Sequence, residues 1–147
     1  KLAKKGKNYI ELPYTIKGMD FAFSGIQTKI NQLVQTGKHK TEDLCFSAQE
    51  TVFAELTEAT ERAIAHINKN EILLTGGVAA NSRLQEMLKI MSKERGVKFA
   101  VVPMALAGDN GAMIAWQGIL EQKANYKMKD TAINQHWRTD DVDVTWL

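Results

Sequence analysis

The stretch Glu71-Ile-Leu-Leu-Thr-Gly-Gly-Val-Ala-Ala-Asn-Ser82 decides the fold of this 147-residue chain. A short apolar run ends at paired glycines, and apolar residues then return at helical spacing. The apolar positions of this expected helix are Leu84, Met87, Leu88 and Met91. Residues 97–102 form a second apolar run, and a further helix is expected over 109–122. Strands that alternate with helices predict an α/β fold, with a mixed, mostly parallel sheet covered by helices.

The N-terminal half has a different organisation. Residues 1–6 are expected to be a flexible lead-in, and residues 9–17 an extended or edge segment because β-branched and aromatic residues surround a proline. A short helix is expected over 25–35. The segment 41–68 predicts one long amphipathic helix, for which Thr41 is a suitable cap. The apolar stripe of this helix is Cys45, Ala48, Val52, Leu56, Ala59, Ala63 and Ile67.

Composition and charge limit the class of protein. With 44% hydrophobic and 24% charged residues, the chain is typical of one globular domain. The single Cys45 excludes an internal disulfide or a cysteine-based zinc cluster. Residues 1–40 carry eight lysines against two acids, whereas residues 41–147 carry eleven basic and fifteen acidic residues. The basic end is either a solvated surface or a patch that faces a polyanion such as nucleic acid.

No membrane partner is expected. The longest runs without a charge, residues 72–82 and 110–120, have eleven residues each, whereas a spanning helix needs about 20. No signal peptide is recognisable, so a cytoplasmic location is expected. The chain opens with Lys1 and not with methionine, which suggests a piece of a larger protein.

The turn at Gly76 and Gly77 is the first candidate site. Paired glycines allow backbone conformations and close approaches that a side chain would block. The helix that follows offers free N–H groups to a phosphate, and Asn81 can donate and accept hydrogen bonds there. The alternative is a plain tight turn in which Asn81 only caps the helix.

The second candidate site is Asp109. Its carboxylate is a hard oxygen ligand of the kind that Mg²⁺ or iron accepts, and glycines at positions 108 and 111 leave room for something to approach it. The alternative is that Asp109 caps the last helix. A single carboxylate is not a metal site, so the residues alone leave both interpretations open.

Other chemical constellations are not found in the sequence. His39, His66 and His136 lie far apart and are expected to be surface or capping residues. Cys45 is expected to be a small buried hydrophobic residue and not a nucleophile. The methionines at helical positions are expected to fill the core. These methionines are Met87, Met91 and Met113.

Several segments together resemble the tRNA threonylcarbamoyladenosine synthase family, in the archaeal and eukaryotic branch that works in the KEOPS complex. Gly76-Gly-Val-Ala-Ala-Asn81 and Asp109-Asn-Gly-Ala-Met-Ile-Ala115 are highly specific when they occur together. The other matching segments are residues 11–25, 47–53, 82–84, 108, 138–140 and 144–146. One departure is Ala107, where many members of the branch have cysteine.

The resemblance implies a fold and an activity. The fold is of the actin-like ATPase type, in which two ribonuclease H-like lobes clamp ATP, and residues 1–147 would be the C-terminal lobe without the first. The activity is transfer of a threonylcarbamoyl group from threonylcarbamoyl-adenylate to N6 of the adenine next to the anticodon of tRNA. Gly76, Gly77 and Asn81 would bind the nucleotide or adenylate. Asp109 would ligate one divalent or iron-type metal ion, with a histidine pair from the first lobe.

The resemblance also implies partners. These are the first lobe, tRNA, and KEOPS subunits that include a small kinase-like ATPase. No general base can be named from this half, and the chain alone is expected to be inactive. Two alternatives remain: a sugar-kinase-like or chaperone-like ATPase lobe, which would share the glycine turn but not residues 109–115, and a non-catalytic scaffold.

Overall fold

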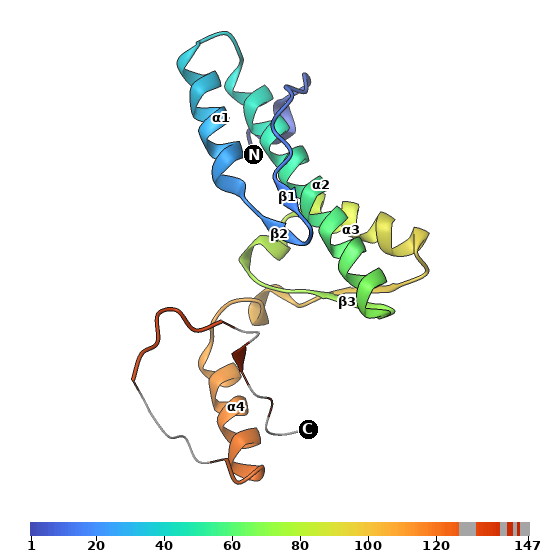
Figure 1. Cartoon of the computed structure of the whole chain (residues 1–147), viewed down its shortest axis with the longest axis vertical. Coiled ribbons are helices and arrows are strands. Elements are labelled where there is room, and N and C mark those ends of the chain that lie inside the picture. Colours follow the sequence, from blue (N-terminus) through green and yellow to red (C-terminus); the bar gives the residue numbers. More distant parts are fainter. Residues whose placement is uncertain (127–131, 139–140, 143, 145–147) are drawn as a thin grey trace. The chain divides into compact units, whose positions relative to one another are not determined.

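The computed structural model describes residues 1–126, 132–138, 141, 142 and 144, and the chain divides into two units, residues 1–107 and 108–147. The elements of the first unit are η1 (Ala3–Lys5), β1 (Ile16–Lys17), β2 (Asp20–Phe21), α1 (Phe23–Gln35), α2 (Thr41–Ile67), β3 (Glu71–Leu74), η2 (Gly77–Ala80), α3 (Ser82–Glu94), β4 (Lys98–Val101) and η3 (Met104–Leu106), where η marks a 3₁₀ helix (Figure 1). The second unit contains α4 (Gly111–Lys123). The resembling residues 139, 140, 145 and 146 lie outside the described part.

The two N-terminal helices confirm the expectations from periodicity. The first, α1, begins two residues earlier than predicted, and α2 ends at Ile67, where Asn68 takes the left-handed conformation with φ +50°. The predicted cap at Thr41 was wrong. Thr41 is the first residue of the helix, and Lys40 precedes it in extended conformation without a side-chain hydrogen bond to the first turn.

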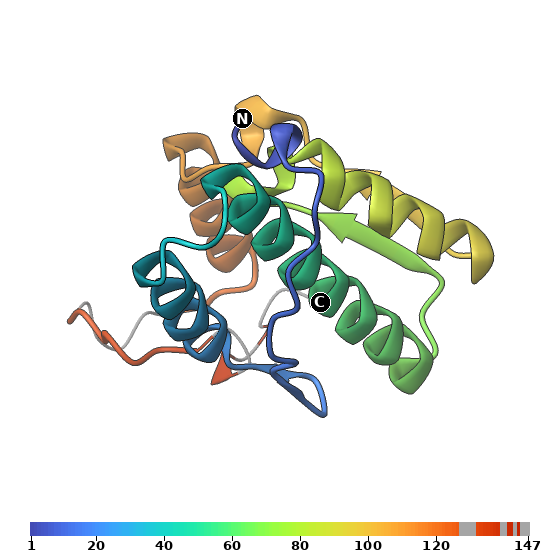
Figure 2. The same cartoon turned by 90° about the horizontal axis from the view of Figure 1, so that it is seen from above.

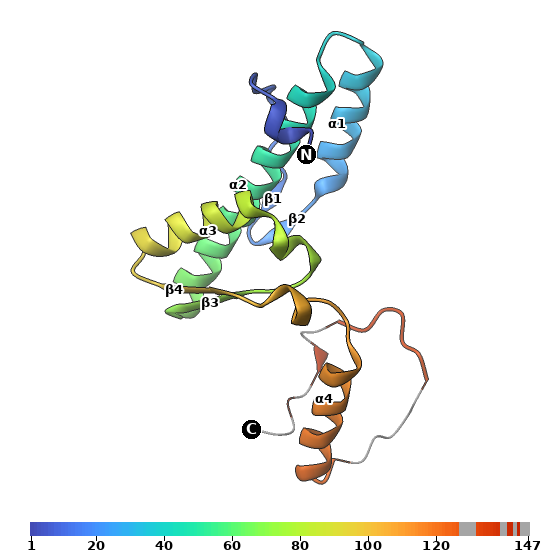
Figure 3. The ribbon, with the colours of Figure 1, turned by 180° about the vertical axis from the view of Figure 1, so that it is seen from behind.

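The strand, turn and helix predicted around the paired glycines are confirmed. Strands β3 and β4 run parallel and side by side, and α3 connects them (Figure 3). Alternate residues of both strands face the helices, because successive side chains point to opposite faces of a sheet. The core of the unit is Phe53 of α2 with Leu84, Leu88 and Met91 of α3, packed against Val52, Leu56, Ile64, Ile72, Leu74, Met87 and Phe99.

The sheet itself is smaller than the sequence predicted. Among the described residues, the parallel part has only β3 and β4, and a separate antiparallel hairpin joins β1 and β2. The expectation of α/β structure is confirmed, whereas helices on both faces of a large sheet are not found within the first unit. The face of β3 that carries Leu73 stays open, and Leu73 is 65% exposed.

The N-terminal segment is not a free lead-in, which corrects the sequence prediction. The short helix η1 packs against α2, and an added Cβ at Gly6 would lie 2.4 Å from the Glu42 carbonyl oxygen and from the Phe46 Cβ. Glycine is required there because any side chain would push the two elements apart. Residues 7–15 then run along α2 as an extended strap (Figure 2).

Polar side chains at positions 43, 47 and 55 of α2 hold the strap. Asp43 Oδ1 accepts from the Lys7 and Asn8 backbone N–H groups at 2.8 and 3.1 Å. Ser47 Oγ accepts from the backbone N–H of the strap at position 10, at 2.8 Å. Glu55 accepts from Thr15 N and Oγ1, at 2.9 and 2.6 Å. Three polar residues of α2 are therefore buried on a face that the apolar stripe did not reveal. These residues are Asp43, Ser47 and Glu55.

Acid should loosen the strap through Asp43. The side-chain amide of Asn8, followed by the backbone N–H groups of Lys7 and Asn8, lowers the pKa of the Asp43 carboxyl from 3.8 to about 2. A lowered pKa in the folded state stabilises the fold above the unfolded pKa, and this stabilisation disappears as the pH falls toward 2. Urea unfolding at pH 5 and pH 2.5 should therefore show a smaller pH dependence for Asp43→Asn than for the wild type. The exposed Glu94→Gln is the control and should match the wild type; equal pH dependence in all three proteins would contradict the prediction.

The second unit is described by its helix. No residue of α4 is buried, and Met113 is 45% exposed, so the prediction that Met113 fills the core was wrong, whereas Met91 is buried and Met87 packs against the core. The helix is apolar on several sides. In the described part of the chain, no helix has the length and apolarity needed to cross a bilayer.

Candidate functional site

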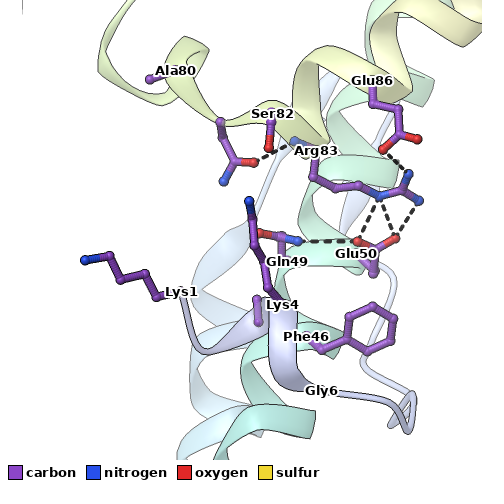
Figure 4. A pocket seen from close by; sticks show the side chains of 12 residues that line it. Lys1, Lys4, Gly6, Phe46, Gln49, Glu50, Ala80, Ser82, Arg83 and Glu86 are labelled. Atoms are coloured by element: carbon purple, nitrogen blue, oxygen red, sulfur yellow. Dashed lines mark hydrogen bonds and ion pairs between the residues drawn. The ribbon is translucent and has the colours of Figure 1, made fainter.

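A hollow of about 750 Å³ lies where η1, α2 and the start of α3 meet, all in the first unit. The residues that line it are Lys1, Ala3, Lys4, Gly6, Phe46, Gln49, Glu50, Ala80, Asn81, Ser82, Arg83 and Glu86 (Figure 4). Three cationic and two anionic side chains give this lining a net charge of +1. An anionic ligand is therefore favoured over a cationic one.

One wall of the hollow is an ion-pair cluster centred on Arg83. Its Nη2 lies 2.8 Å from Glu50 Oε2, its Nε lies 3.0 Å from Glu50 Oε1, and its Nη1 lies 2.8 Å from Glu86 Oε2. Hydrogen bonds that the Arg83 guanidinium donates to Glu50 and then to Glu86 raise its pKa, so it stays charged. With one cation against two carboxylates this cluster has a net charge of −1, so the positive charge of the hollow comes from Lys1 and Lys4. Lys1 lies on the side away from the cluster (Figure 4).

Asn81 caps α3 with one end of its amide only. Its Oδ1 accepts from Arg83 N at 2.9 Å, which is the cap that the sequence offered as the alternative to ligand binding. Its Nδ2 makes no hydrogen bond to any described residue, and the side chain lines the hollow. An amide nitrogen carries two N–H donors. Capping and ligand binding are thus compatible in Asn81, because they use different atoms.

The two glycines stand one turn before the hollow and do not line it. Gly76 has φ +90°, a conformation that an L side chain rarely adopts, so a glycine is required at the end of β3. Gly77 opens η2, and a Cβ added to it would meet nothing within 4 Å. The structure therefore brings Asn81 to the hollow, and it gives Gly76 a backbone role in turning the chain toward Asn81.

Asp109 does not cap the last helix. Asn110 is the cap: its Oδ1 accepts from Met113 N at 2.9 Å, and its Nδ2 donates to Gly108 O at 3.0 Å. The Asp109 carboxylate is exposed and has no hydrogen bond or ion pair with the described residues. The alternative to metal binding was that Asp109 caps the last helix. This alternative is wrong, because Asn110 is the cap.

Asp109 belongs to no metal-binding cluster in the part of the chain that the structure describes. Among the described residues, no group of three or more His, Cys, Asp or Glu side chains is placed to hold a metal ion. A free, exposed carboxylate has the donor chemistry that a hard cation needs, but its partners must come from elsewhere. All three histidines are exposed, as predicted, and Cys45 is half-buried on α2.

Sequence reasoning missed the cluster around Arg83 and the part that Lys4 plays in the hollow. The pair Arg83 and Glu86 has the i, i+3 spacing of helix ion pairs, so this contact was open to prediction. The contact with Glu50 joins residues 33 positions apart, and only the packing of α3 on α2 creates it. Nothing in the composition of residues 1–6 indicates that η1 closes one side of the hollow.

Comparison with known proteins identifies the family. The family model described as TsaD, tRNA N6-adenosine threonylcarbamoyltransferase, matches residues 1–116. This match contains both glycine-rich turns, the hollow and Asp109.

Relatives with the same name match almost the whole chain. A tRNA N6-adenosine threonylcarbamoyltransferase of Thermococcus kodakarensis is 55% identical over 99% of this chain and 46% of its own length, and one of Archaeoglobus fulgidus is 54% identical over 99% and 45%. A "probable bifunctional tRNA threonylcarbamoyladenosine biosynthesis protein" of Methanobrevibacter smithii is 52% identical over 100% of this chain and 27% of its own length. The chain spans less than half the length of these curated relatives. On the family match and on these identities, the chain belongs to the tRNA N6-adenosine threonylcarbamoyltransferase family.

Proposed function

We propose that this chain is the nucleotide-binding and metal-binding half of a transferase that moves a threonylcarbamoyl group from threonylcarbamoyl-adenylate to N6 of the adenine next to the anticodon of tRNA. The observation that carries the proposal is the family match over residues 1–116, which includes every candidate site residue. In this proposal the chain is the C-terminal lobe of an actin-like ATPase fold. A first lobe, tRNA and KEOPS subunits with a small kinase-like ATPase are its partners in the cytoplasm.

The adenylate suits the chemistry of the hollow. It carries a phosphate and the threonine carboxylate, and the two unpaired lysines, Lys1 and Lys4, give the hollow a positive side. The free Nδ2 of Asn81 would donate to an acceptor on the ribose or the base. The wall formed by Arg83 and its two carboxylates is already satisfied, so it would fix the start of α3 and hold Asn81 in place without binding the ligand itself.

Asp109 would hold the metal ion as one of several ligands. The others, a histidine pair, would come from the first lobe. When bound, such an ion polarises an oxygen of the adenylate and neutralises charge that develops on the leaving phosphate. Asp109 itself would contribute an anionic oxygen, which forms no hydrogen bond or ion pair with the other described residues.

The transfer is a substitution at the carbonyl carbon of the threonylcarbamoyl group. The lone pair of the tRNA N6 amine attacks this carbon, a C–N bond forms, and the bond from the carbon to the adenylate phosphate oxygen breaks, so that AMP leaves with the electron pair. The amine also loses one proton, which passes to the solvent, so that the products are modified tRNA, AMP and H⁺. The task of this half is to place the adenylate, which lowers the barrier by orientation and not by proton transfer from a named side chain.

A chimera tests the proposal. In it, this chain replaces the matching 46% of the Thermococcus kodakarensis relative, and the product is supplied with threonylcarbamoyl-adenylate and tRNA. Transfer to tRNA is expected from the chimera and not from the chain alone, because a ligand clamped between two lobes loses about half its contacts when one is missing. A folded chimera without transfer, beside an active intact relative, would overturn the proposal.

A further inference from the structure

The first unit carries a cluster of lysines outside the hollow, at the N-terminal end of α2. A second hollow of about 330 Å³ lies there, lined by Lys5, Lys7, Asn8, Lys40, Glu42 and Asp43. Lys38 lies two residues before Lys40 in the turn that leads into α2. We refer to Lys5, Lys7, Lys38 and Lys40 as the lysine patch.

No lysine of the lysine patch forms an ion pair with a described residue, and two hollows on either side of η1 bring the patch close to Lys4. Within the described residues, the ion pairs involve Arg62, Arg83, Arg95 and Lys98. The four lysines of the patch are exposed and form no ion pair with a described residue, although, after the hydrogen bonds from Asn8 and Lys7, the charge of Lys40 also helps to lower the pKa of the Asp43 carboxyl. Unpaired surface cations raise the positive potential, whereas paired ones largely cancel.

The acids beside the patch cancel only part of its charge. Both oxygens of Asp43 already accept hydrogen bonds from the strap, and its neighbour Glu42 adds a second negative charge. Four lysines against two carboxylates leave +2, and the lining of the larger hollow adds its net +1, which comes from Lys1 and Lys4. The excess of positive charge in residues 1–40 is thus concentrated at one end of α2.

The patch continues into the candidate nucleotide hollow. Successive residues of η1 line the two hollows: Lys4 belongs to the larger and Lys5 to the smaller. Because Gly6 allows η1 to sit directly on α2, the two hollows share this helix as a common rim. A polyanion that lies across η1 would therefore pass from the lysine patch to the mouth of the larger hollow.

We propose that the lysine patch binds the sugar-phosphate backbone of the tRNA whose adenine enters the larger hollow. This inference rests on the proposed function for the identity of the RNA. Exposed lysines contact phosphates and carry no base recognition, so the patch would set affinity and position and not sequence specificity. Membrane lipid headgroups offer the same phosphate chemistry, but adjacency to a nucleotide hollow favours RNA.

The test compares two variants of this chain with equal charge change. The first is Lys5→Gln, Lys7→Gln, Lys38→Gln and Lys40→Gln together. The second, a control, changes four exposed lysines that also lack ion pairs to glutamine, at Lys69, Lys89, Lys93 and Lys123. Binding of a tRNA transcript is measured by fluorescence anisotropy between 50 and 200 mM KCl, and circular dichroism melts confirm that each variant is folded.

The patch variant should bind tRNA at least tenfold more weakly at 100 mM KCl. The slope of log K against log salt should fall by about 3, since each lost phosphate contact removes roughly 0.7 to 0.9. The control should stay within twofold of the wild type. Equal losses in both variants, no loss in the patch variant, or no measurable binding of tRNA by the wild type at 50 mM KCl would overturn the inference, as would binding to phosphatidylserine vesicles in preference to tRNA.

The experiments distinguish a failure of this inference from a failure of the proposed function. If the chimera transfers threonylcarbamoyl groups equally well with and without the four patch substitutions, the patch is not the tRNA surface and the function stands. If the chimera is folded and transfers nothing, the function is wrong, whereas the anisotropy result still decides whether the patch binds RNA.

Discussion

Changing Asp109 to asparagine in the chimera will lower threonylcarbamoyl transfer about 100-fold or more and reduce the bound metal, while the stability of the fold stays unchanged. Asparagine keeps the size of the side chain but replaces an anionic oxygen by a neutral one, and a hard cation binds a carboxylate far better than an amide. The structure shows no hydrogen bond of Asp109 that the change would break among the described residues. Metal analysis of the purified protein and a transfer assay measure the two effects.

Asn110→Ala is the matched control for Asp109→Asn. Asn110 provides the cap of α4 through its contact with Met113 N, and loss of a cap costs about 1 kcal/mol. Hydrogen exchange should therefore become faster in the first turn of α4 in Asn110→Ala and stay unchanged in Asp109→Asn. Normal metal content and normal transfer in Asp109→Asn would remove Asp109 from the site. Faster hydrogen exchange in Asp109→Asn would show that Asp109 contributes to the cap of α4.

The elements with a clear period or a clear boundary signal could be predicted from sequence. The 27-residue α2 follows from apolar residues at spacings of three and four, and the turn at Gly76 follows from paired glycines between a strand and a helix. Parallel pairing of β3 and β4 follows from the helix between them. In each case the information lies within about 30 residues of sequence.

Two kinds of error have physical causes. At α2 the cap was predicted at Thr41, and at α4 a cap at Asp109 was one of two open alternatives, but the helices begin after Lys40 and Asn110, because the start of a helix is fixed by backbone geometry that residue type only biases. The strap was missed because buried Asp43, Ser47 and Glu55 look like a solvated face of α2. Only the partner segment, 30 to 40 residues away, makes their burial possible.

The candidate site, like the fold, was predicted only in part. Asn81 was predicted, since one motif contains the turn, the cap and the amide. The positive side of the hollow was not predicted, because it depends on Lys4 and on the close packing of η1 against α2 that Gly6 allows. The sugar-kinase and chaperone alternatives are not supported, because the family match includes residues 109–115, which those proteins were not expected to share.

Substitutions at Asn81 will separate its two functions atom by atom. Asn81→Ala removes both the Oδ1 cap and the Nδ2 donors, and it should lose about 1 kcal/mol of unfolding free energy as well as nucleotide affinity. Asn81→Ser and Asn81→Asp keep an oxygen that can cap α3 but have no N–H donor, and serine and aspartate are as good at this position as asparagine. Both should keep the unfolding free energy of the wild type.

Nucleotide affinity should nevertheless fall in all three variants, by roughly 1 to 3 kcal/mol, which is the cost of leaving a ligand acceptor unpaired. Calorimetry with ATP on the chimera measures this affinity, and urea unfolding of the same proteins measures stability. Asn81→Ser is the decisive variant because, unlike Asn81→Asp, it adds no negative charge that would repel phosphates by itself. Wild-type ATP affinity in both Asn81→Ala and Asn81→Ser would show that the Nδ2 donors do not reach the nucleotide and that Asn81 acts on α3 alone, since serine still has a hydroxyl donor and alanine has none.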